Sequence, residues 1–73
     1  MKGFMFLVNS KTARISESYA IKKDISIDEA MKSFLSSTTY RVLNDEETGL
    51  YLEVLEFVYD MFLDEMGEDY NEA

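Results

Sequence analysis

Hydrophobic residues recur at helical spacing along most of the chain. In residues 4–23 they fall four and seven positions apart, which places them on one stripe of a helix; they are Phe4, Val8, Ile15 and Tyr19. The first five, Phe4–Val8, also fit a short buried strand, and periodicity does not separate the two possibilities over so short a run. Lys22 and Lys23 end the predicted helix, where positive charge complements the helix dipole.

A capping signal marks the start of a second helix. Ser26 is followed three positions later by Glu29, so each side chain can bond the backbone N–H of the other residue. Apolar residues then continue at helical spacing, and they are Ile27, Ala30, Met31, Phe34 and Leu35. This pattern predicts a helix over residues 27–35.

The remaining pattern predicts one short helix and one long helix. Hydroxyl side chains at 36–39 interrupt the second helix and can cap a short helix or turn near 38–44. A polar turn follows to Gly49, which is free to adopt a positive φ. The last helix is expected from about Leu52 to Met66, with Gly67 as its C-terminal cap. Its predicted core face consists of Leu52, Leu55, Tyr59, Phe62, Leu63 and Met66.

These elements predict an all-α fold, a small bundle of three long helices plus one short helix. We expect a single helical domain over residues 1–67 and an acidic C-terminal tail over residues 68–73. No apolar run approaches the roughly 20 residues that cross a bilayer, and the first residues do not resemble a secretory segment. We therefore expect a soluble, cytoplasmic protein that does not bind membranes.

Composition narrows the possible functions of the 73-residue chain. Without Cys or His it has no disulfide, thiol nucleophile or imidazole base. Its net charge of −8 opposes binding to nucleic acid, whose phosphates would repel it. The charge is divided: residues 1–41 carry all seven bases and four acids, whereas residues 42–73 carry eleven acids and no base. We expect no enzymatic activity, no cofactor and no nucleic-acid partner.

The predicted last helix has two further faces besides its core stripe. Four acids fall within an arc of about 80°, counted at 100° per residue, and they are Glu53, Glu56, Asp60 and Asp64. Beside them lies a second apolar stripe, Val54, Phe57 and Met61. The acids suit either a solvated face or a surface that attracts a basic partner. The stripe suits either a helix packed between two others or an exposed face that binds another protein.

Carboxylates alone give little support for a metal site or an active site. Residues 45–49 lack the spacing of a calcium-binding EF-hand loop, and di-iron bundles require His. Glu56 and Asp60 could in principle form an acid–base pair, but an exposed helix gives the two carboxylates no difference in environment that would assign them opposite roles. We therefore predict no catalytic residue and no metal ligand.

The turn at residues 45–51 has two open interpretations. It can be a structural turn in which Gly49 is left-handed and Leu50 and Tyr51 anchor the loop in the core. It can also be a recognition loop that presents Asp45 and Tyr51 to a partner. With one Gly and no Lys, it is not a phosphate-binding loop.

A motif spans this turn and continues into the last helix. It reads Ser33-x-x-Ser36-x-Thr38-x-Tyr40-x-x-Leu43-x-Asp45-x-Glu47-Thr48-Gly49-Leu50-Tyr51-x-Glu53, then Phe57-Val58-Tyr59-Asp60. Over residues 15–66 the chain resembles a family of small uncharacterised bacterial proteins with an E-T-G-L-Y core after a short S-x-T-[YF]-x-x-L run. That family looks similar to proteins encoded beside ADP-ribosyltransferase-like toxin genes, so the resemblance implies an antitoxin or accessory role. The family pattern has Ser-Pro at the helix entry, where this chain has Val54-Leu55.

The leading hypothesis is a non-enzymatic protein-binding module that binds a basic partner protein. The alternatives are a homodimer that buries the same apolar stripe on itself, and an inhibitor that mimics nucleic acid. The residues predicted to bind the partner are Asp45, Tyr51, Glu53, Val54, Glu56, Phe57, Asp60, Met61 and Asp64.

Overall fold

The computed structural model describes residues 2–68, which form an all-α fold with no strand in that range. Three helices have nine residues or more and one has six, in agreement with the predicted bundle. In chain order the elements are α1 (Lys2–Lys23), α2 (Ile27–Leu35), α3 (Thr38–Leu43), η1 (Glu46–Thr48), η2 (Leu50–Leu52) and α4 (Leu55–Met66). The helix alternative for residues 4–8 is therefore correct, and the strand alternative is wrong.

The chain reverses direction between α1 and α2 through a short connection. Asp24 adopts a left-handed conformation with φ 57°, which ends α1. The predicted capping box then starts α2: the Glu29 N–H donates to the Ser26 hydroxyl at 3.1 Å, and the Ser26 N–H donates to the Glu29 carboxylate at 3.4 Å. Two backbone donors that a helix start leaves free are thereby satisfied, so α2 occupies the predicted residues 27–35.

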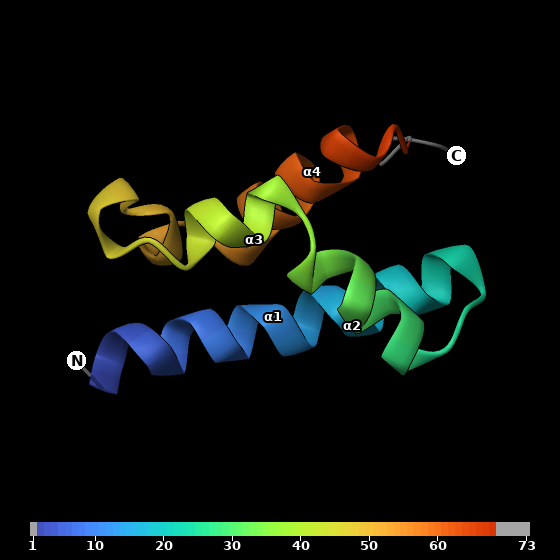
Figure 1. The fold of residues 1–73 in the computed structure, drawn as a ribbon, viewed down its shortest axis with the longest axis horizontal. Helices are drawn as coiled ribbons and strands as arrows, with labels where there is room; N and C mark the ends of the chain where they lie inside the picture. Colours follow the sequence, from blue (N-terminus) through green and yellow to red (C-terminus); the bar gives the residue numbers. More distant parts are fainter. Residues whose placement is uncertain (1, 69–73) are drawn as a thin grey trace.

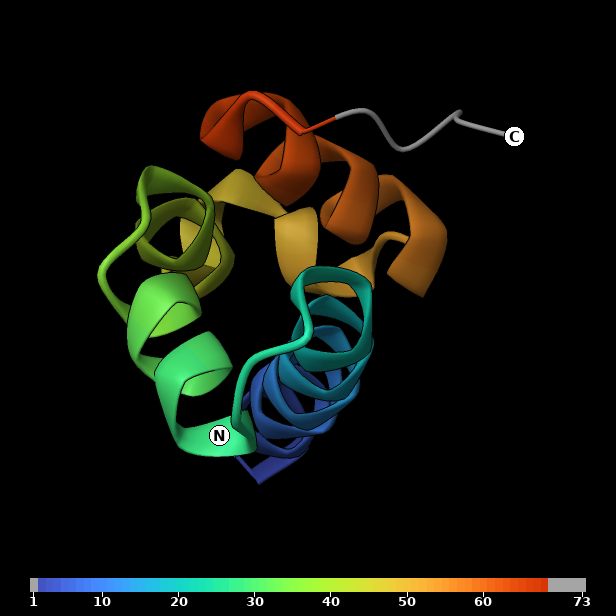
Figure 2. The same cartoon turned by 90° about the vertical axis from the view of Figure 1, so that its right-hand side faces the viewer.

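The four α-helices lie in two layers (Figure 1). α1 and α2 pack against each other in one layer, and α3 and α4 form the other. The segment that holds η1 and η2 lies at the same end of the molecule as the start of α1, whereas α4 ends near the α1–α2 connection. Seen along the long axis, the helices surround a common interior (Figure 2).

Aromatic rings fill this interior. Phe62 of α4 meets Tyr19 of α1 edge to face at 4.8 Å and Phe34 of α2 at 5.0 Å. Phe34 in turn meets Tyr40 of α3 at 5.6 Å. Such edge-to-face pairs add about 0.5–1.5 kcal/mol each beyond the area that they bury. Phe62 and Phe34 are completely buried, so these two rings connect the two layers at the centre of the core.

The stripe predicted on α1 faces this core. Val8, Ile15 and Tyr19 are buried, and Phe4 packs against the core while remaining partly exposed. α1 also buries Ser16, whose hydroxyl has no hydrogen-bond partner among the described residues. The apolar periodicity of α1 was therefore sufficient to find its buried side.

Residues 45–53 form a compact turn rather than an irregular loop. Gly49 adopts φ 73°, the predicted left-handed conformation, between η1 and η2. The Thr48 hydroxyl lies 2.7 Å from the carbonyl oxygen of Val42 and 2.8 Å from that of Asp45. It shares its single proton between them and so holds the turn against α3. Leu50 is buried, which matches its expected role as an anchor. The two 3-10 helices themselves were not predicted.

Glu68 is the last described residue and is bonded to the rest of the fold. Its N–H donates to the carbonyl of Leu63 at 2.8 Å, and its carboxylate pairs with Lys23 at 2.6 Å. The hydrogen bond from Lys23 to the Glu68 carboxylate and the negative charge of that carboxylate raise the pKa of Lys23. The rest of the predicted tail, residues 69–73, lies outside the described residues.

Candidate functional site

α4 carries most of the residues predicted to bind a partner, and its start differs from the prediction. The helix begins at Leu55 rather than Leu52. It ends at Met66 as expected, and Gly67, with a φ of 75°, is the expected left-handed cap. Val54 is the N-cap residue, has an extended backbone, and gives no side-chain cap. Leu52 belongs to η2 and is 67% exposed, so its predicted place in the core is wrong.

The later start changes the proposed acidic row. Glu53 precedes the helix with an extended backbone, so it does not continue the row at helical spacing. Glu56, Asp60 and Asp64 remain on α4, each four residues from the next. They lie along one edge of the helix, because four residues is close to one helical turn.

The buried side of α4 is formed by Val58, Phe62 and Leu63. Phe62 and Leu63 were expected there. Val58 was not assigned to any face in advance, yet it is completely buried. The core stripe of α4 is therefore wider than its apolar pattern indicated.

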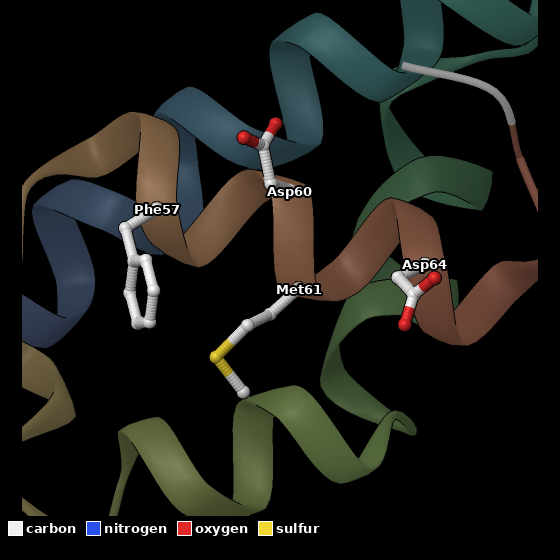
Figure 3. A pocket seen from close by; sticks show the side chains of 4 residues that line it. All are labelled: Phe57, Asp60, Met61 and Asp64. Carbon is white, nitrogen blue, oxygen red and sulfur yellow. The ribbon is translucent and has the colours of Figure 1, made fainter. Parts of the chain in front are cut away.

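Phe57 and Met61 lie on the other side of α4, at the edge nearest α3. Figure 3 shows both side chains extending from the same side of the helix toward the ribbon of α3. Phe57 is 50% exposed, whereas Met61 is partly buried and packs against the core. Val54, just before the helix, is 65% exposed. The second apolar stripe is thus open to solvent at Val54 and Phe57 and half-covered at Met61.

A groove of about 350 Å³ runs along this edge of α4 and is lined by Phe57, Asp60, Met61 and Asp64. Two of its residues are apolar and two are carboxylates, each pair spaced by four positions. This volume lies at the small end of the range typical of ligand sites. We call these four residues the α4 groove.

The carboxylates of the α4 groove have no ionic partner within the part of the chain that is described. Lys23 pairs with Glu68 near the C-terminal end of α4, and no ion pair there involves Asp60 or Asp64. Burial raises the pKa of Tyr59, and the charges of Tyr19, Asp60 and Glu68 raise it further. Because Asp60 and Asp64 have no ionic partner among the described residues, the α4 groove combines uncompensated negative charge with an apolar surface.

Asp45 and Tyr51 lie in the turn and do not line the α4 groove. Asp45 is the N-cap of η1, where its carboxylate accepts from the Glu47 N–H at 3.1 Å. The Tyr51 ring packs edge to face on Phe4 at 4.8 Å, and its carbonyl accepts from Lys11 Nζ at 3.0 Å. Both predicted binding residues thus have contacts that hold the turn in place.

Glu65 is an important residue of α4 that the sequence reasoning missed. Its carboxylate accepts hydrogen bonds from the Thr38 N–H at 2.7 Å, the Thr39 N–H at 2.9 Å and the Thr39 hydroxyl at 2.8 Å. Desolvation of the carboxylate is the largest single influence on its pKa and raises it. The hydrogen bonds from the two threonines together outweigh desolvation and hold the pKa of Glu65 below its ordinary value.

The sequence does contain a signal for Glu65. It lies in the last turn of α4, where the helix dipole disfavours a negative charge. A partner that donates hydrogen bonds offsets this cost. Asp64 in the same turn has no ionic partner among the described residues, whereas the start of α3 supplies such a partner to Glu65.

Within residues 2–68, no three acidic side chains lie close enough together to hold a metal ion. None of the described helices has both the length and the apolar character that crossing a membrane requires.

Comparison with known proteins gave no match: none was found among protein-family models, curated proteins or solved structures.

Proposed function

We propose that the protein is a non-enzymatic module that binds a basic partner protein through α4. The observation that supports this most directly is the α4 groove, where Phe57 and Met61 lie beside Asp60 and Asp64. Exposed apolar side chains beside unpaired charges are typical of interfaces in which apolar anchors supply affinity and charges steer the partner. Val54 and Leu52, which precede the helix in the chain, are exposed apolar residues as well.

The motif resemblance suggests a class of partner. It would make the chain an antitoxin or accessory protein that binds an ADP-ribosyltransferase-like toxin. Co-expression with such an enzyme should then yield a complex that survives purification and whose enzymatic activity is reduced.

The direct test is affinity capture with the wild-type chain and with a Phe57→Ala, Met61→Ala variant. We expect the captured protein, once identified and purified, to bind the variant at least tenfold more weakly, and to bind the wild type more weakly as salt rises. A Met5→Ala, Phe6→Ala variant is the matched control, since it removes two exposed apolar side chains from α1 instead. If the partner binds the α4 variant as well as the wild type, α4 is not the interface.

Self-association is the second candidate, because Leu52, Val54 and Phe57 are exposed close together in the sequence. Light scattering on the isolated chain separates the two functions. A dimer that dissociates in the Phe57→Ala, Met61→Ala variant would show that the α4 surface is buried against a second copy. A monomer would favour binding to a different protein.

A further inference from the structure

The two edges of the Phe57–Met61 surface differ, and this asymmetry restricts what can bind there. On one edge, Asp60 and Asp64 have no ionic partner among the described residues. On the other edge, both oxygens of the Glu65 carboxylate accept hydrogen bonds from Thr38 and Thr39 of α3. Carboxylates without a hydrogen bond or ion pair among the described residues therefore lie along the Asp60–Asp64 edge, whereas the carboxylate on the opposite edge is bonded to α3.

The spacing of these groups repeats along the helix. Phe57 and Met61 are four residues apart, as are Asp60 and Asp64, so both pairs repeat at about 6 Å along the axis of α4. A second helix lying along α4 presents its own side chains at the same repeat. The four residues of the α4 groove lie within residues 57–64, about two turns of the helix, so a segment of about the same length would cover them.

We propose that the α4 groove receives a basic amphipathic helix of a partner protein, with one apolar row against Phe57 and Met61 and one row of Lys or Arg against Asp60 and Asp64. This proposal rests on the proposed function and adds the chemistry and the spacing of the segment that is bound. The basic row lies on one side of the apolar row only, because α3 occupies the other edge. Charge complementarity disfavours a second copy of this chain, because two chains of net charge −8 would bring like charges together.

The test uses three synthetic peptides of about 15 residues, close to the shortest length that forms a helix in isolation. The first has Leu at positions i and i+4 and a parallel row of Lys on one side of the Leu row. The second replaces each Lys by Glu, and the third keeps the composition of the first but scrambles the order. Each is titrated into the full chain carrying ¹³C-labelled methionine methyl groups, and the Met61 signal is identified by its loss in Met61→Leu.

We expect the first peptide to shift the Met61 methyl signal and the other two to leave it unchanged. An Asp60→Asn, Asp64→Asn variant should bind the first peptide about fivefold more weakly, since each exposed ion pair contributes modestly. A Glu17→Gln, Asp28→Asn variant removes the same charge from α1 and α2 and should bind like the wild type. Both pairs of acids are at least partly exposed, so neither variant should disturb the fold.

Several results would overturn the proposal. One is equal binding of the Glu peptide or the scrambled peptide. Another is equal weakening in the two charge variants, which would indicate attraction by net charge alone. A third is no shift of the Met61 signal with the first peptide. If a captured protein still depends on Phe57 and Met61, the proposed function stands and only the basic helix is wrong.

Discussion

Oε1 of Glu65 accepts hydrogen bonds from both the backbone N–H and the side-chain hydroxyl of Thr39. The other carboxylate oxygen accepts from the Thr38 N–H, and the Ser37 hydroxyl accepts from the Tyr40 N–H. The first three N–H groups of α3 are thus all bonded, two of them by a side chain that lies 26 or 27 residues later in the chain. A helix of six residues is too short to be stable alone, so α3 depends on α4 for its start.

Replacing Glu65 by Ala removes this cap. We expect the free energy of unfolding to fall by about 1 kcal/mol, the usual effect of losing a helix cap. The loss is kept modest because the carboxylate is largely exposed and water can replace it. Urea unfolding measures the change. The control is Asp64→Ala, which should alter stability by less than about 0.5 kcal/mol. Equal losses in the two variants would contradict a special role for Glu65.

The same contact predicts a pH dependence. The pKa of Glu65 is lowered on folding, so its contribution to stability is present above the ordinary value of 4.5 and disappears as pH falls through the lower value of the folded chain. The difference in stability between the wild type and Glu65→Gln should therefore be constant at neutral pH and shrink below about pH 4.5. Urea unfolding of both chains from pH 7 to pH 3 checks this. If the difference in stability instead grew on acidification, folding would have to raise the pKa of Glu65. The hydrogen bonds from Thr38 and Thr39 would then not be the cause of the pH dependence.

The parts of the fold that were predictable have local causes. The start of α2 follows from the reciprocal bonds of Ser26 and Glu29, which are only three residues apart. The ends at Gly49 and Gly67 follow from the conformational freedom of glycine. The buried side of α1 follows from simple periodicity. In each case, the residues that determine the structure lie within one or two helical turns of each other.

The parts that were missed depend on other causes. Leu52 lies three residues before Leu55, so it fits the helical period of α4 although the helix has not begun there. No Ser, Thr, Asp or Asn marks the actual N-cap at Val54. The cap on α3 joins residues far apart in sequence, so no local pattern indicates it. Periodicity identified Phe57 and Met61 as a separate stripe, but it did not determine that Phe57 is exposed.

The buried hydroxyl of Ser16 should be dispensable. Ser16 is completely buried on α1 and its hydroxyl has no partner among the described residues, so the group loses its hydration without compensation. We expect Ser16→Ala to raise the free energy of unfolding by about 1 kcal/mol. Ser18→Ala is the control: it makes the same change at an exposed position of α1 and gains only helix propensity, about 0.5 kcal/mol. Equal increases in the free energy of unfolding of the two variants would mean that burying the Ser16 hydroxyl does not destabilise the fold.

The left-handed turn should be sensitive to a side chain. Gly49 has φ 73°, and although a Cβ there would meet no atom within 4 Å, the backbone conformation itself disfavours other residues. We expect Gly49→Ala to lower the free energy of unfolding by about 1 kcal/mol. Gly3→Ala provides the contrast, because Gly3 lies within α1 with open space around it and should gain stability from helix propensity. A stabilised Gly49→Ala variant would contradict the left-handed turn.

Two phenylalanines five residues apart on α4 should behave in opposite ways. Phe62 is completely buried and contacts Tyr19 and Phe34, so Phe62→Ala should cost about 3–5 kcal/mol. That equals the whole net stability that a domain of this size usually has, about 3–5 kcal/mol. We therefore expect Phe62→Ala to lose its helical circular dichroism signal at 25 °C. Phe57 is half-exposed, so Phe57→Ala should keep that signal and lose less than about 1 kcal/mol. If Phe57→Ala also unfolded, Phe57 would be a core residue, and the loss of partner binding in its variants would no longer identify an interface.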